Sequence, residues 1–130
     1  MSVGESSTPL GRVRGTGSAH HGGEHWLRER LTSAALLLLG LWFVASLLLL
    51  PDLTRGTLAE WLASPSGAVP MILFVIVAFM HSVDGLKTVI DDYVHDEANR
   101  LLATGLLYLG GVGAAALALF CLARIAFGAD

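Results

Sequence analysis

"MHSVDGLKTVIDDYVHDE", residues 80–97, is the most informative segment for the fold of this chain. It follows "MILFVIVAF", a strongly apolar run, and holds two histidines, five acids and one lysine. Ionisable groups inside a membrane are costly and need partners, whereas in a loop they are solvated. The fold therefore depends on whether this stretch continues the apolar segment as a helix or ends it.

The composition of the whole chain favours a membrane protein. The chain has 130 residues, of which 54% are hydrophobic and 15% charged, whereas soluble domains have roughly 25% charged residues. The formal net charge is −3, and the basic residues form no cluster, so we expect no nucleic-acid partner. The single cysteine, Cys121, excludes an internal disulfide framework and a cysteine-based zinc site.

Two segments are long enough to cross a bilayer. Residues 31–50 carry no charge, and twenty helical residues rise about 30 Å, the thickness of the hydrocarbon core. Residues 101–123 are also uncharged and are rich in Gly and Ala, which let helices approach closely in lipid. Between them, Val69–Met80 gives only twelve apolar residues, too few to span. This middle segment is either re-entrant or a helix that continues through "HSVDGLKTVI" with its polar groups on one face.

We predict an all-α membrane protein with three transmembrane helices, up-down-up, over about residues 29–50, 70–93 and 101–124. Residues 1–24 are predicted to be a flexible cytoplasmic segment and 25–130 the membrane anchor. The N-terminal side holds six basic residues: Arg12, Arg14, Arg28, Arg30, Lys87 and Arg100. The other side holds Arg55 and Arg124, so the positive-inside rule places the N-terminus in the cytoplasm and the C-terminus in the periplasm. The loop from Pro51 to about Pro70 is then periplasmic, and Trp26, Trp42 and Trp61 are candidate interface anchors.

A helix through the middle segment would align four residues on one stripe. At 100° per residue these are His81, Gly85, Thr88 and Asp92. His81 lies about 16 Å from Pro70, near mid-bilayer. A neutral imidazole is a common iron ligand, and Gly85 leaves room for a flat macrocycle, so His81 is a candidate axial haem ligand. The alternative is a histidine that only hydrogen-bonds a neighbouring helix.

A haem iron with two protein ligands would need a second chain. The first and third spans contain no His and no Met. Met71 and Met80 share the helix with His81 and point elsewhere. The second ligand would therefore come from another subunit.

Tyr93 and Asp92 lie at the cytoplasmic boundary of the predicted helix. A tyrosine there is either an interface anchor or a phenol that hydrogen-bonds the carbonyl of a quinone, with Asp92 paired to a cation of a partner. Asp91, Asp96 and Glu97 are interpreted as a solvated face or a docking surface. Asp84 and Lys87 lie within the helix, and the sequence does not identify their partners.

The segment before the first span, "HHGGEHWLRERLT", offers His21 and His25 at i,i+4 spacing. Gly22 and Gly23 weaken the helix that a metal site would need, so the roles of His20, His21 and His25 are not predicted. Arg28 and Arg30 are expected at the headgroup level. Arg30 is also placed to meet an anionic group such as a haem propionate.

These residues resemble a known family. "HSVDGLKTVIDDYVH" resembles the H-x₃-G-x₆-D-Y-V signature of the hydrophobic membrane anchor of proteobacterial succinate dehydrogenase (respiratory complex II). The entry into the first helix, "LGRVRGTGSA" followed by "HW" and then by Arg-x-Thr, also matches, as does the three-span length. The resemblance implies that His81 is an axial ligand of haem b, that Tyr93 binds ubiquinone, that Asp92 organises the quinone site and that Arg30 lies near the haem propionates.

The resemblance also implies partners. The second haem ligand would come from the cytochrome b556 subunit, a second three-helix anchor, and an iron–sulfur subunit and a flavoprotein would sit on the cytoplasmic face of the inner membrane. This chain would then carry no dehydrogenase active site of its own. Two alternatives remain: the anchor of a fumarate reductase or another b-type cytochrome, and a small non-redox membrane protein in which His81 only joins helices.

Overall fold

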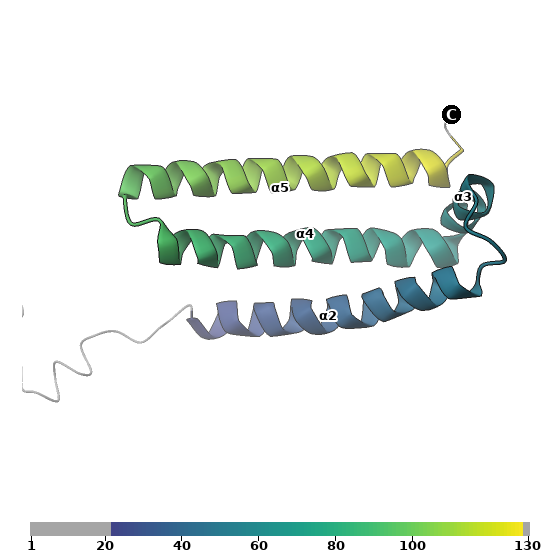
Figure 1. Cartoon of the computed structure of the whole chain (residues 1–130), viewed down its shortest axis with the longest axis horizontal. Helices are drawn as coiled ribbons and strands as arrows, with labels where there is room; N and C mark the ends of the chain where they lie inside the picture. Colours follow the sequence, from purple (N-terminus) through teal and green to yellow (C-terminus); the bar gives the residue numbers. More distant parts are fainter. Residues whose placement is uncertain (1–21, 129–130) are drawn as a thin grey trace, which may run out of the picture.

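The computed structural model describes residues 22–128, which form four helices. They are α2 (Gly22–Leu49), α3 (Arg55–Ala63), α4 (Pro65–Tyr93) and α5 (Glu97–Ala126). The long helices α2, α4 and α5 run side by side in alternating directions, with α4 in the middle (Figure 1). Among the described residues α4 contacts every other helix, whereas α2 and α5 do not contact each other. The three long helices therefore form a single layer.

All three long helices are apolar enough to cross a membrane, and the segments that qualify are Trp26–Leu49, Pro65–Tyr93 and Glu97–Ala126. No hydrophobic side chain in the described part of the chain is buried. Leu48, Leu49 and Leu109, for example, are 80%, 85% and 74% exposed. Such surfaces would not be stable in water and need lipid or another subunit to cover them. The predicted all-α fold with three spans is confirmed.

The middle segment is one continuous helix, so the re-entrant alternative is wrong. Helix α4 begins at Pro65, five residues before the expected start at Pro70. The hydroxyl of Ser64 accepts a hydrogen bond from the amide of Gly67 at 3.2 Å, and Pro65 follows as the first helical residue. A serine cap followed by proline is a favourable helix start, since the first amides of a helix lack partners within it.

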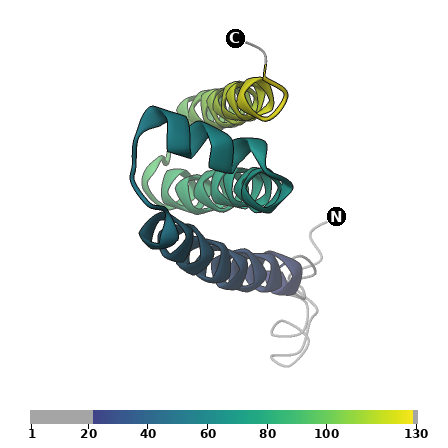
Figure 2. The same cartoon turned by 90° about the vertical axis from the view of Figure 1, so that its right-hand side faces the viewer.

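The loop between the first two spans contains a helix that was not predicted from the sequence. Helix α3 lies at one end of the layer, in front of α4 and next to α5 (Figure 2), and packs against both of these helices. Trp61 of α3 stacks on Trp42 of α2, with ring centroids 5.7 Å apart. Trp42 and Trp61 therefore join the two helices by aromatic packing, whereas Trp26 is 58% exposed.

A cluster of hydrogen bonds precedes α3. The carboxylate of Asp52 accepts from the hydroxyls of Thr57 and Thr54 at 2.5 and 2.7 Å and from the amide of Thr54 at 3.0 Å. These bonds, that of Thr57 first, lower the pKa of the Asp52 carboxyl, because they stabilise its charged form. Asp52 thereby fixes the residues that begin α3.

Helices α4 and α5 approach closely at one glycine. A Cβ atom on Gly111 would lie 2.5 Å from Cγ2 of Val83 on α4, closer than a real contact allows. A Cβ on Gly110 or Gly113 would meet nothing within 4 Å. Of these three glycines, only Gly111 is needed for the small-residue packing typical of membrane helices.

Candidate functional site

Polar side chains of the middle helix, α4, contact those of the first helix, α2, at two places. Nη2 of Arg28 lies 2.9 Å from Oδ1 of Asp84, and Oγ1 of Thr32 lies 3.0 Å from Nδ1 of His81. The helices are antiparallel, so one turn forward on α2 corresponds to one turn back on α4. We call these four residues the polar ladder.

Asp84 is the most enclosed member of the polar ladder. It is 7% exposed and is the only polar or charged residue that is buried in residues 22–128. A buried carboxylate needs a cation and hydrogen bonds to offset its desolvation. Arg28 supplies both, while its own side chain remains 51% exposed and reaches the edge of the helix pair. The partner of Asp84, which the sequence did not identify, is therefore Arg28.

His81 is half-buried, and only one of its ring nitrogens is engaged. Nδ1 faces Thr32, whereas Nε2 makes no hydrogen bond within the described part of the chain. A Cβ atom on Gly85, one turn further along α4, would meet nothing within 4 Å. A histidine with one free nitrogen beside an open position fits one axial ligand of a haem. The ring also hydrogen-bonds a neighbouring helix, so both sequence interpretations of His81 are compatible with this geometry.

Arg30 does not join the polar ladder. It lies 200° around α2 from Arg28, nearly on the opposite face. Its guanidinium carbon lies 5.3 Å from the ring centroid of Trp26, in cation–π geometry. The arginine of α2 that pairs with α4 is therefore Arg28, which binds Asp84 one turn from His81. The haem-propionate role of Arg30 stays a prediction.

Asp92 and Tyr93 lie at the exposed end of α4. Tyr93 is 78% exposed, and no side-chain hydrogen bond or ion pair joins either residue to residues 22–128. Lys87, which also lacked a predicted partner, pairs with Asp91 one turn along the same helix. Tyr93, predicted to bind a quinone, and Asp92, predicted to organise the quinone site, thus have no side-chain partner within residues 22–128.

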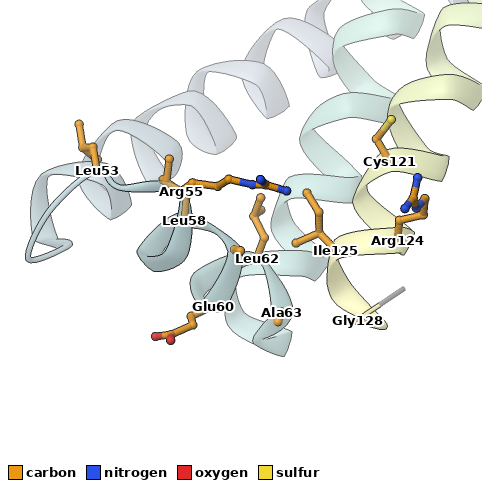
Figure 3. Close-up of a pocket in the computed structure, with 11 residues that line it drawn as sticks. Leu53, Arg55, Leu58, Glu60, Leu62, Ala63, Cys121, Arg124, Ile125 and Gly128 are labelled. Atoms are coloured by element: carbon orange, nitrogen blue, oxygen red, sulfur yellow. The ribbon is translucent and has the colours of Figure 1, made fainter. Parts of the chain in front are cut away.

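Two of the hollows in residues 22–128 lie beside the long helices, and neither of them is lined by His81, Asp92 or Tyr93. The smaller, of about 270 Å³, lies between the adjacent ends of α4 and α5. Its lining residues are Lys87, Asp91, Glu97, Arg100, Leu101 and Thr104. The larger, of about 970 Å³, lies between α3 and α5 at the other end of the layer (Figure 3). Both hollows are open to the surface of the chain.

The histidines before the first span remain untested. His20, His21 and the side chain of His25 lie outside the described residues. Within residues 22–128 no group of three or more His, Cys, Asp or Glu side chains could hold a metal ion.

This arrangement defines a class: a multi-pass helical membrane protein whose central helix carries a histidine within its length and a tyrosine as its last residue. The family model described as "Succinate dehydrogenase/Fumarate reductase transmembrane subunit" matches residues 5–123. The chain belongs to this family, as its resemblance predicted.

Relatives named "Succinate dehydrogenase hydrophobic membrane anchor subunit" support the assignment. The protein of Paracoccus denitrificans is 31% identical over 122 residues, which cover 94% of each chain. That of Rickettsia bellii is 31% identical over 93 residues, covering 72% of this chain and 73% of the relative. That of Rickettsia conorii is 29% identical over 94 residues, covering 70% and 75%.

Proposed function

We propose that this chain is the hydrophobic membrane anchor of a succinate:ubiquinone oxidoreductase and that it helps to bind haem b and ubiquinone. The observation that carries the proposal is His81 on a candidate membrane-spanning helix: its Nε2 makes no hydrogen bond within residues 22–128, and the open position at Gly85 lies one turn further along the same helix. Membership of the family supports the anchor role and argues against the alternative of a small non-redox membrane protein.

The proposed haem site uses this chain for one side only. Nε2 of His81 would bind the iron, and Gly85 would leave the space that the macrocycle needs. Haem b, when bound, supplies a one-electron carrier. The described spans other than α4 contain no His and no Met within 29–50 or 97–126, so the second axial ligand would come from the cytochrome b556 subunit. Arg30 would face the propionates only if the haem extends around α2.

The proposed quinone site lies at the end of α4. The phenol of Tyr93 would donate a hydrogen bond to a carbonyl oxygen of ubiquinone, and Asp92 would pair with a cation of the partner and hold the geometry. Reduction of a quinone to a quinol takes two electrons and two protons. A site at Tyr93, at the end of a membrane-spanning helix, would be close enough to the aqueous side to receive those protons.

The proposed assembly places the iron–sulfur subunit and the flavoprotein on the same side as Tyr93. Charged side chains gather there, at the adjoining ends of α4 and α5: Lys87, Asp91, Asp96, Glu97 and Arg100. Dehydrogenation of succinate would occur in the flavoprotein, and this chain would contribute to quinone reduction. The excess of basic residues on this side supports a cytoplasmic location in a bacterial inner membrane.

A fumarate reductase anchor is the second candidate, because the matching family model includes both enzymes. The relatives compared above are named for succinate dehydrogenase, which favours that direction.

The proposal is tested on the complex purified in detergent with its co-expressed neighbours. We expect a flavoprotein and an iron–sulfur protein to copurify and a reduced-minus-oxidised spectrum to show a b-type band. An intact, quinone-reducing complex without that band would contradict the haem part of the proposal. Failure of the chain to copurify with any flavoprotein would contradict the anchor role.

A further inference from the structure

We infer that Thr32 is a positioning residue for His81: its hydroxyl accepts the Nδ1 proton and thereby directs the free electron pair of Nε2 away from α2. The inference rests on the proposed function, since it assigns the residue that prepares the proposed haem ligand. Thr32 belongs to a different helix from His81, and the contact joins residues 49 positions apart.

The direction of the hydrogen bond follows from the neighbours of the hydroxyl. Oγ1 of Thr32 lies 2.9 Å from the carbonyl oxygen of Arg28 and 3.1 Å from that of Glu29. Carbonyl oxygens only accept, and a hydroxyl has one proton to donate. With that proton directed to the carbonyls, as is common for threonine in helices, the oxygen can only accept from Nδ1. The ring is then the tautomer with hydrogen on Nδ1, which leaves Nε2 unprotonated.

The opposite direction would remove the ligand. A Thr32 hydroxyl that donated to Nδ1 would require the hydrogen on Nε2, and a protonated Nε2 cannot bind iron. Histidines that bind metals usually donate their other N–H to an acceptor, which fixes the tautomer and the ring orientation. Thr32 has the position and the chemistry of that acceptor.

The other contact of the polar ladder, the ion pair between Arg28 and Asp84, supports the hydrogen bond between Thr32 and His81. Asp84 is one turn from His81 on α4, and an unpaired carboxylate there would compete for the Nδ1 proton. Its Oδ1 is instead 2.9 Å from Nη2 of Arg28. The backbone carbonyl of the same Arg28 accepts the hydrogen bond from the Thr32 hydroxyl. The ion pair and the hydroxyl are thus joined through one residue and fix α2 against α4 at the level of His81.

The test compares three variants in the intact complex. Thr32→Val keeps the size and the branching of the side chain and removes the hydroxyl, whereas Thr32→Ser keeps the hydroxyl and removes the methyl group. Ser33→Ala is the matched control, because the Ser33 hydroxyl makes the same kind of bond to the Glu29 carbonyl, at 2.7 Å, on the exposed side of α2. The readouts are haem content, the electron paramagnetic resonance spectrum of the ferric haem and its midpoint potential.

We expect Thr32→Val to alter the ferric haem spectrum and to raise the midpoint potential. Without an acceptor for the Nδ1 proton the imidazole is a weaker donor and stabilises the ferric state less. Haem retention should fall on the order of 10-fold. Thr32→Ser and Ser33→Ala should resemble the wild type in all three readouts. Thr32→Ala provides a second hydroxyl-free variant if the valine variant does not assemble.

The outcomes separate this inference from the function on which it rests. A wild-type complex without a b-type haem would overturn the proposed function. A wild-type haem that His81→Ala removes, but that keeps its spectrum and potential in Thr32→Val or Thr32→Ala, would overturn the role of Thr32 alone. A serine variant as altered as the valine variant would show that the methyl group matters and not the hydroxyl, which also contradicts the inference.

Discussion

Removal of Arg28 should destabilise the helix layer more than removal of its partner Asp84. In Arg28→Ala the carboxylate of Asp84, whose side chain is only 10% exposed, loses its cation. Breaking a buried ion pair from one side typically costs about 3–5 kcal/mol, and because the Arg28 side chain is half exposed we expect about 2–3 kcal/mol. In Asp84→Ala the exposed guanidinium can turn to water or headgroups, so the cost should be about 1 kcal/mol.

The assay is equilibrium unfolding of the purified protein in mixed micelles, with both single variants and the double variant. The double variant should recover part of the loss in Arg28→Ala, which gives a coupling free energy of about 1–2 kcal/mol. Lys87→Ala is the control, because the exposed pair with Asp91 on one helix contributes at most about 0.5 kcal/mol. Equal losses in the two single variants, with no coupling, would refute the interpretation of Asp84 as a buried charge that depends on Arg28.

Three further outcomes follow from the contacts. Gly111→Ala should destabilise the α4–α5 pair by about 1–3 kcal/mol through overpacking against Val83, while Gly110→Ala, with open space at its Cβ, should be neutral or stabilising in the same unfolding assay; a harmless Gly111→Ala would contradict the close approach. Tyr93→Phe should slow quinone reduction and leave succinate-to-dye electron transfer intact, and unchanged quinone reduction would reduce Tyr93 to an interface anchor. Because the pKa of Asp52 is lowered, its charged form stabilises the fold above about pH 4, and this contribution is lost as the pH falls through the folded-state pKa. The difference in unfolding midpoint between wild type and Asp52→Asn should therefore disappear in acid. A difference that persists there would contradict a charge-based role.

The fold was largely predictable because its signals are local. Residues 31–50 and 101–123 are long and uncharged, and helical periodicity alone aligned the polar residues of the middle segment. The start of α4 was not predicted, although Ser64-Pro65 is a typical helix beginning. Helix α3 was not predicted because its nine residues are too few to span a membrane and lie in the connection between two predicted spans.

The polar ladder was not predictable, because periodicity shows which residues share a face but not which residue of another helix they meet. The pairing of Arg28 with Asp84, and of Thr32 with His81, depends on the register of α2 against α4. In hindsight two polar residues one turn apart on each helix were the available signal. The proposed haem and quinone pockets would be completed by surfaces of other subunits, and a pattern in one chain does not specify those surfaces.

The most direct test of the proposed haem role is the reduced-minus-oxidised spectrum of the assembled complex with His81→Ala. We predict that the b-type band is lost or strongly shifted in this variant, while the complex still assembles and succinate-to-dye electron transfer is retained. An assembled His81→Ala complex with an unchanged band and an unchanged haem midpoint potential would contradict the assignment of His81 as an axial ligand.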